Sequence, residues 1–213
     1  MTTDTTVDTS GYVYEDSALN ASHAYLLPAV AEILASLNLP HGRKRIFELG
    51  CGNGAIADAL TKHGYQITGI DASVQGIQQA QQARPHLSLQ LGSVYDRLAA
   101  QHGRFPVVLS LEVVEHLYAP RDFAGTLFDL VEPSGTAIVS TPYHGYWKNL
   151  ALAVTGKMDG HFTALWDHGH IKFWSMTTLG MLLQEAGFRA ITFHRVGRIP
   201  LLAKSMIAVA RKG

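Results

Sequence analysis

The sequence predicts an α/β fold with a mostly parallel β-sheet and helices on both faces. Between residues 46 and 140, short apolar segments alternate with segments of helical periodicity, which is typical of strands joined by crossover helices. The run 106–111 is apolar at nearly every position, as in a strand that is covered on both sides. Glycines alternate at positions 50, 52 and 54, where a strand is expected to turn sharply into a helix.

The first half of the chain starts with an amphipathic helix within 12–39. Its apolar stripe consists of Leu26, Leu27, Val30, Ile33, Leu34 and Leu37, and a stripe of this kind packs against a core. Strands and helices then alternate up to the middle of the chain. We expect strands at 46–49, 65–71 and 87–91 and helices at 55–60 and 74–83.

The second half continues the pattern with one interruption. A segment rich in His, Trp, Tyr and Gly occupies residues 142–172. The expected elements on either side of it are strands at 106–111, 136–140, 190–196 and 205–210, helices at 122–131 and 177–186, and a turn at 132–135.

The composition indicates one globular domain with no broad nucleic-acid surface. Lys and Arg number 17, as do Asp and Glu, in 213 residues, so no extended basic surface is expected. Cys51 is the single cysteine, which suits a reducing compartment, and we expect a cytoplasmic protein. No apolar run approaches the ~20 residues of a transmembrane helix. The oligomeric state is left open between monomer and homodimer.

Polar and glycine residues gather where the predicted strands end. The glycine turn, Asp71, Ser93 and Glu112 each follow a strand, and parallel strands bind ligands beyond their carboxyl ends. A carboxylate at Asp71 can accept hydrogen bonds from both hydroxyls of a ribose. Glu48, just before the glycines, suits an amine-bearing ligand better than the pyrophosphate of a dinucleotide.

The run Glu48-Leu49-Gly50-Cys51-Gly52-Asn53-Gly54 resembles the first motif of class I S-adenosylmethionine-dependent methyltransferases. The segments 69–71, 92–94 and 109–116 fall where the later motifs of that family fall. The resemblance implies a Rossmann-like class I methyltransferase fold with a seven-stranded, mostly parallel sheet, and an enzyme of the EC 2.1.1 class. Many relatives carry an acid where Ser93 stands. The cofactor-binding residues that the resemblance implies are Glu48, Gly50, Cys51, Gly52, Asn53, Gly54, Asp71, Ala72, Ser93, Val94 and Leu111.

Glu112, Glu115 and His116 are spaced i, i+3 and i+4, which would place them on one face of a helix. Together with His170 they are our candidates for the catalytic residues. The same four residues are also candidates to bind a divalent metal, magnesium or a similar ion, since carboxylates and imidazoles are suitable ligands. Without a metal, His116 would act as a general base or a structural hydrogen-bonding group.

Three functions remain open at this point. The chain resembles ubiquinone-type O-methyltransferases, which implies O-methylation of a small phenolic, catechol-like or quinol molecule. The Glu112–His116 pattern and the later His170 also resemble small-RNA 3′-terminal 2′-O-methyltransferases, in which such residues hold a metal. A non-catalytic S-adenosylmethionine-binding regulatory subunit is the third alternative. The balanced charge favours the small-molecule acceptor.

The resemblance divides the single domain into four parts. They are a tail and lid helix (1–42), a cofactor-binding core (43–141), a substrate-side insertion (142–175) and a C-terminal helix with two strands (176–213).

A helix is also expected at 149–155 in the insertion, where core packing is favoured over peripheral membrane contact.

Two aromatic groups are expected near the ligands. The first group would form a lid and consists of Tyr12, Tyr14, His23 and Tyr25. The second would line the acceptor pocket and consists of Tyr143, Tyr146, Trp147, Phe162, Trp166, Phe173 and Trp174.

Overall fold

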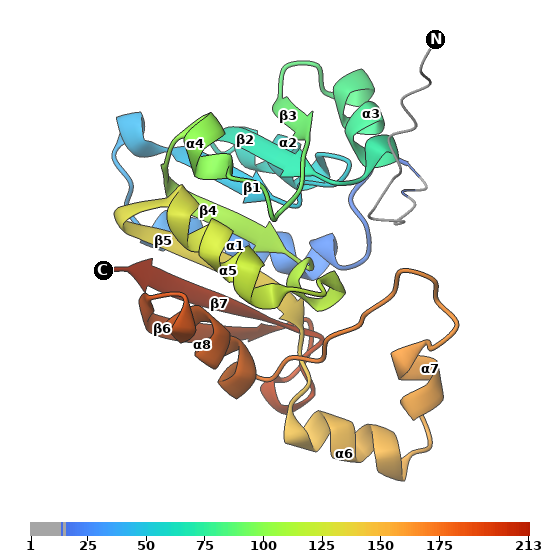
Figure 1. Ribbon diagram of the computed structural model, residues 1–213. Coiled ribbons are helices and arrows are strands. Elements are labelled where there is room, and N and C mark those ends of the chain that lie inside the picture. Colours follow the sequence, from blue (N-terminus) through green and yellow to red (C-terminus); the bar gives the residue numbers. More distant parts are fainter. Residues whose placement is uncertain (1–13, 15) are drawn as a thin grey trace.

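A computed structural model describes residue 14 and residues 16–213. Its centre is a seven-stranded sheet of order β3-β2-β1-β4-β5-β7-β6 (Figure 1). β1 to β5 are parallel, and β7 runs antiparallel to both of its neighbours. The predicted Rossmann-like fold is therefore confirmed. The strands are β1 (Arg45–Leu49), β2 (Gln66–Asp71), β3 (Ser88–Leu91), β4 (Phe105–Leu111), β5 (Val131–Pro142), β6 (Phe188–Val196) and β7 (Ser205–Lys212).

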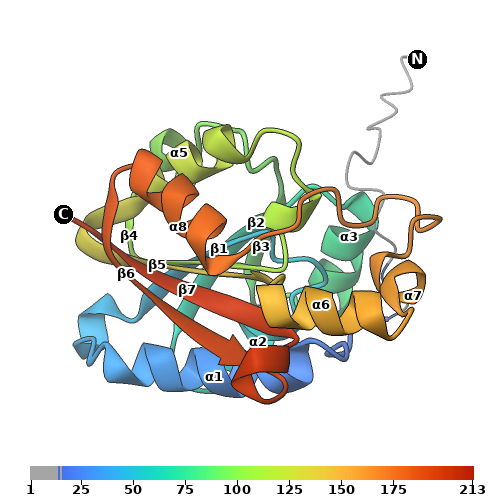
Figure 2. The ribbon, with the colours of Figure 1, turned by 90° about the horizontal axis from the view of Figure 1, so that it is seen from below.

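Helices cover both faces of the sheet (Figure 2). One face carries α1, α2 and α3, and the other carries α4, α5 and α8. The helices are α1 (His23–Ser36), α2 (Ala55–Thr61), α3 (Val74–Ala83), α4 (Leu98–His102), α5 (Pro120–Leu130), α6 (Tyr146–Val154), α7 (Met158–Phe162) and α8 (Met176–Glu185). Short 3₁₀ turns are η1 (His41–Arg43), η2 (Val114–His116) and η3 (Pro200–Leu202).

The alternation of side chains along β4 supplies both layers of the core. Val107 and Leu109 pack with Leu26 of α1, whereas Val108 packs with Phe123 of α5 on the other face. All five side chains are fully buried, and full burial of each such side chain stabilises the fold by about 1.5–3 kcal/mol. The nearly continuous apolar run of β4 follows from this double coverage.

Two local expectations differ from the structure. The predicted turn at 132–135 is a bulge inside β5, because Phe105 pairs with Val131 whereas Val107 pairs with Thr136. The helix α4 was not predicted, since five residues are too few to show a helical period.

The insertion lies beyond the ends of the sheet, and its helices α6 and α7 lie apart from the helices that cover the two faces (Figure 1). The prediction that the helix at 149–155 packs in the core is wrong. No residue of α6 is buried, and the side chain of Trp147 is 59% exposed. Among the described residues, no helix is both long and apolar enough to span a bilayer.

Candidate active site

A cavity of about 1140 Å³ opens at the carboxyl ends of β1, β2 and β4. All four candidate catalytic residues line it, and so does every predicted cofactor-binding residue except Gly54. Gly54 instead begins α2 with φ of 76°. A Cβ at this position would overlap the side chain of Leu89, so glycine here permits both the left-handed turn and close packing.

The glycine turn is held against the end of β2. The backbone amides of Gly50 and Cys51 both donate to the carbonyl oxygen of Ile70 at 2.9 Å. Gly52 has φ of 54°, and a Cβ on it would overlap the Tyr14 hydroxyl. The backbone can therefore approach Tyr14, or a ligand, more closely than any other residue type would allow.

Asp71 ends β2 with its carboxylate fixed by two backbone amides. Its Oδ2 accepts from the amide of Gly52 at 2.8 Å, and its Oδ1 accepts from the amide of Ser73 at 2.8 Å. Asp71 also lines the cavity, and an ionised carboxylate can accept about four hydrogen bonds. The geometry suits a ligand with two adjacent hydroxyls.

Glu48 is 2% exposed, and its Oε2 atom has no hydrogen-bond partner among the described residues. Burial, and then the negative charge of Asp71, raises the pKa of Glu48 to about 8. The carboxyl is thus mainly protonated at neutral pH in the free protein. A ligand ammonium group beside it would favour the charged form.

A segment that we call the strap (Tyr14 and residues 16–20) lies across the glycine turn. Gln75 holds both backbone groups of Tyr14, because its Oε1 accepts from the Tyr14 amide at 2.9 Å and its Nε2 donates to the Tyr14 carbonyl at 3.0 Å. Gln79 Nε2 donates to the same carbonyl at 2.9 Å. Asn53 Nδ2 donates to the carbonyls of Asp16 at 2.8 Å and Ala18 at 3.2 Å.

Sequence reasoning missed these strap contacts. Their one signal is the i, i+4 spacing of Gln75 and Gln79, which places both on one face of α3. Of the four aromatic residues predicted as a lid, Tyr14, His23 and Tyr25 line the cavity, and Tyr12 lies outside the described residues.

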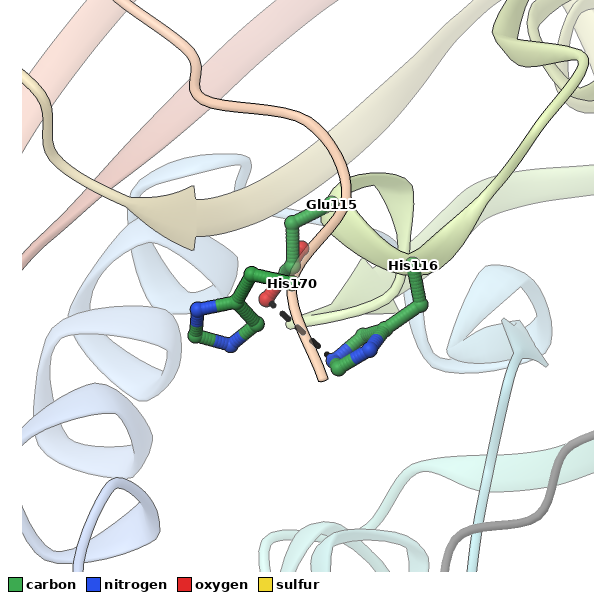
Figure 3. Close-up of side chains that lie close together, drawn as sticks. All are labelled: Glu115, His116 and His170. Atoms are coloured by element: carbon green, nitrogen blue, oxygen red, sulfur yellow. Dashed lines mark ion pairs between the residues drawn. The ribbon is translucent and has the colours of Figure 1, made fainter. Parts of the chain in front are cut away.

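Glu115, His116 and His170 form a compact group on the cavity wall (Figure 3). One potential ligand atom from each lies within 4.8 Å of the others, and His116 Nε2 is 4.0 Å from Glu115 Oε1. Glu115 is 1% exposed, and neither carboxylate oxygen has a hydrogen-bond partner in the described part of the chain. Burial raises the pKa of Glu115 well above its usual value. Such a group is costly unless a cation or a donor reaches it.

The backbone orients both imidazoles. His116 Nδ1 donates to the carbonyl oxygens of His168 at 3.2 Å and Gly169 at 3.3 Å, which leaves a lone pair on Nε2. The carbonyl of Glu115 accepts from the amides of Ile171 at 2.9 Å and Lys172 at 3.0 Å. These bonds bring the segment of His170 against η2, across more than fifty residues of chain.

Burial keeps both histidines neutral. It lowers the pKa of His116, and it is the main reason why the pKa of His170 falls to about 4. Neutral imidazoles can accept a proton or bind a metal.

The expected helix over 112–116 is wrong, because η2 covers only three residues and Glu112 has φ of 55° at the end of β4. Glu112 therefore lies outside the group of three. Its carboxylate instead accepts from Ser140 Oγ at 2.7 Å and Ser205 Oγ at 3.3 Å. Burial raises the pKa of Glu112 to about 7.

The expected aromatic wall is largely wrong, since Trp166 is the one of the seven aromatic residues that lines the cavity. Phe162 and Phe173 instead pack around His144, with ring centroids at 5.9 and 5.1 Å. Trp174 Nε1 donates to the Val114 carbonyl at 3.3 Å. The insertion residues that line the cavity are mostly not aromatic: Pro142, Lys148, Ala151, Leu152, Thr155, Lys157, His161, Trp166, His168, Gly169, His170 and Ile171.

Comparison with known proteins gives a family and several relatives. The profile of the family described as "Methyltransferase domain" matches residues 21–192. A ubiquinone biosynthesis O-methyltransferase of Caulobacter sp. (strain K31) is 35% identical over 116 residues, covering 53% of this chain and 46% of the relative. The mitochondrial protein of that name from Schizosaccharomyces pombe is 32% identical over 132 residues, covering 58% and 46%. The chain spans about half the length of the curated relatives it matches.

Solved structures share the fold. The methyltransferase domain of bacterial CtHen1 superposes with a TM-score of 0.66 at 23% identity, over 90% of this chain and 100% of that one. Magnesium protoporphyrin IX methyltransferase from Synechocystis PCC 6803 with bound SAH superposes with a TM-score of 0.61 at 18% identity, over 88% and 84%.

Proposed function

The chain belongs to the methyltransferase domain family, and from this premise we propose that it methylates an oxygen atom of a small hydroxylated molecule. It is a class I S-adenosylmethionine-dependent methyltransferase. Relatives named ubiquinone biosynthesis O-methyltransferase support oxygen as the acceptor atom. The observation that carries the proposal is the group Glu115, His116 and His170, which shares one cavity with the glycine turn.

The residues of the cofactor half fit S-adenosylmethionine, which supplies a methyl group on a positively charged sulfur. Asp71 would accept hydrogen bonds from the ribose hydroxyls, and Glu48 would face the ammonium group. Two observations support this fit: the buried, unpartnered Oε2 of Glu48 and the turn at Gly52, where no Cβ can be accommodated. Ser93, Val94 and Leu111 would line the adenine side.

The acceptor half supplies a base. His116 is held by its Nδ1 and presents a neutral Nε2 toward the cavity. We propose that Nε2 takes the proton of the acceptor hydroxyl as the methyl group is transferred. Since methyl transfer is an in-line displacement, most of the remaining contribution of the protein is to position the oxygen.

The same group fits a divalent metal. Glu115, His116 and His170 would hold it, and a carboxylate with two imidazoles suits zinc or manganese better than magnesium, which prefers oxygen ligands. The two unpartnered oxygens of Glu115 are the observation that supports this fit. A bound cation would lower the pKa of an acceptor hydroxyl and favour substrates with two adjacent oxygens. With a metal bound, Nε2 of His116 would be a ligand and could not take the proton, so His116 is the base only without a metal.

The surface next to the cavity suits an acceptor with an apolar part. Ala151 and Leu152 of α6 and Leu202 of η3 line the cavity. Outside it, Trp147, Leu150 and Val154 of α6 are exposed. The exposed apolar side chains of this helix also favour a peripheral contact with a membrane.

An assay of acceptors tests the proposal. The protein is first heated with and without S-adenosylhomocysteine, and a rise in melting temperature reports occupation of the cofactor site. Catechols, quinols, flavonoid-like phenols and short RNA with a free 3′ end are then incubated with S-adenosylmethionine, with Mg²⁺ or with EDTA, and products are identified by mass. We expect a mono-O-methylated small molecule. Methylation of RNA alone, or of carbon or nitrogen, would overturn the proposal.

A further inference from the structure

The acceptor side of the cavity is basic. Lys148 of α6, Lys157, Arg198 and Lys204 all line the cavity, and none of them forms an ion pair with a carboxylate of the described residues. The three lysines come from α6 and the loops that follow α6 and η3, and Arg198 precedes η3. Because α6 packs against η3, and because Lys148 and Arg198 act on each other through their charges, these two cations lie at the same end of the cavity.

The acidic residues of the cavity do not neutralise this end. Asp71 is held by the amides of Gly52 and Ser73 on the cofactor side. Glu48 and Glu115 are buried and have raised pKa values. Glu112 attracts the charge of Lys148, but its hydrogen bonds come from two serines.

Lys148 is the most constrained of the four cations. Its Nζ donates to the carbonyl oxygens of Tyr143 at 2.8 Å and Lys204 at 3.4 Å. An ammonium group has three donors, so one remains for a ligand. Burial, and then the positive charge of Arg198, lowers the pKa of Lys148 to about 8.

A purely structural role for Lys148 would not explain why Arg198 also faces the cavity. The hydrogen bonds of Lys148 tie α6 to the end of β5 and to the start of β7, and this role needs no second cation. Arg198 comes from a different element, is exposed at the cavity and repels Lys148. His144, His161 and His170 lie in the field of Lys148 as well. Two like charges that face one cavity, neither of them in an ion pair with a carboxylate of the described residues, favour an anionic ligand.

The cavity is large enough for this ligand beside the cofactor. Its volume of about 1140 Å³ exceeds the ~300–1,000 Å³ that is usual for a single small-molecule site. We propose that the methyl acceptor carries an anionic group, a carboxylate or a phosphate, which pairs with Lys148 and Arg198 while its hydroxyl lies at His116. This inference rests on the proposed function and specifies its substrate class.

Binding of matched probes to the protein loaded with S-adenosylhomocysteine tests the inference by calorimetry. The probes are 3,4-dihydroxybenzoate, 3,4-dihydroxyphenylphosphonate and the neutral 3,4-dihydroxybenzamide. We expect at least one anion to bind tenfold or more tightly than the amide, and the preferred anion distinguishes a carboxylate from a phosphate site. In Lys148→Met and Arg198→Gln the preference should fall below threefold, with affinity for S-adenosylhomocysteine unchanged.

Two further variants separate charge from folding. Lys148→Arg should keep the preference, and Lys62→Met, at an exposed lysine that does not line the cavity, should leave it unchanged. If Lys148→Met does not fold, Arg198→Gln decides the question. Equal binding of anions and amide, or no binding of either anion, overturns the inference. Failure to bind S-adenosylhomocysteine would instead overturn the proposed function.

Discussion

The Nε2 atom of His116 lies 4.0 Å from the Oε1 atom of its chain neighbour Glu115, on the wall of the cavity. Adjacent side chains seldom converge in this way, and the 3₁₀ turn η2 makes it possible here. The Nδ1 bonds to the carbonyls of His168 and Gly169 keep the imidazole in place. The pair is thus preorganised to receive a cation or a hydroxyl group.

The first prediction concerns this pair. Saturating Mn²⁺, Zn²⁺ or Mg²⁺ should stabilise the protein, because a ligand at 100 times its Kd contributes about 2.7 kcal/mol. For a chain of this size the melting temperature would rise by about 5–10 °C. In Glu115→Gln the rise should be lost, since the remaining imidazoles bind more weakly.

His161→Asn is the matched control for the metal prediction, because His161 lines the same cavity but lies outside the group of three. It should respond to metal as the wild type does. No metal by elemental analysis, no thermal response and full activity in EDTA would together contradict the metal site and leave His116 as the base.

The second prediction concerns Asp71. Asp71→Asn keeps the shape of the side chain but removes the charge that strengthens hydrogen bonds from ribose hydroxyls, each of which contributes about 1.5–3 kcal/mol. The Kd of S-adenosylhomocysteine, measured by calorimetry, should rise about 10- to 100-fold. Asp122→Asn is the control, since Asp122 is exposed on α5 and does not line the cavity. Equal losses in both variants would show that ribose binding is not what is being measured.

The third prediction follows from Glu48. Its pKa rises from 4.5 to about 8 in the folded protein. Its contribution to stability is therefore fully present below pH 4.5 and is lost as the pH rises through about 8. Between pH 5 and 8.5, the free energy of unfolding of the wild type should fall relative to that of Glu48→Gln, by at most about 5 kcal/mol.

Urea denaturation at several pH values measures this difference. Glu185→Gln, which removes an exposed carboxyl paired with Arg121, should show no such divergence. S-adenosylhomocysteine should reduce the loss above pH 7, since its ammonium favours the charged carboxylate. A constant difference between wild type and Glu48→Gln would contradict the buried, protonated state.

That the glycine turn and Asp71 lie together could be predicted from the sequence, because it follows from strand order alone. Parallel strands place their carboxyl ends together, so the glycine turn and Asp71 had to meet. The prediction that His170 lies near Glu115 came from the motif resemblance alone. The hydrogen bond from the Ile171 amide to the Glu115 carbonyl, which brings the two together, leaves no periodic pattern in the sequence.

The failures have equally specific causes. A positive φ at Glu112 broke the expected helix. Phe162 and Phe173 pack against each other within the insertion, and neither lines the cavity. Apolar character in α6 predicted burial, but in the described chain α6 packs mainly against the short elements η3 and α7, which leave none of its residues buried. For side chains that bind distant backbone, such as Gln75 on Tyr14, the i, i+4 spacing of Gln75 and Gln79 shows a shared helix face but not the partner.

The last prediction concerns the strap. The double variant Gln75→Ala, Gln79→Ala removes three hydrogen bonds to the backbone of Tyr14, each with a net contribution of about 1 kcal/mol. Amide exchange at residues 16–20 should accelerate. If Tyr14 covers the cofactor as its contact with Gly52 suggests, the Kd of S-adenosylhomocysteine should rise about 5- to 30-fold.

Gln78→Ala is the matched control for the strap, because Gln78 lies between the two glutamines in sequence and is exposed to solvent. It should change neither exchange nor affinity. Faster exchange with an unchanged Kd would mean that the strap packs on the turn without covering the ligand. Unchanged exchange in the double variant would contradict the role of the two glutamines, since the bonds from Asn53 to Asp16 and Ala18 and from Arg84 to Ser17 would then be enough to hold the strap.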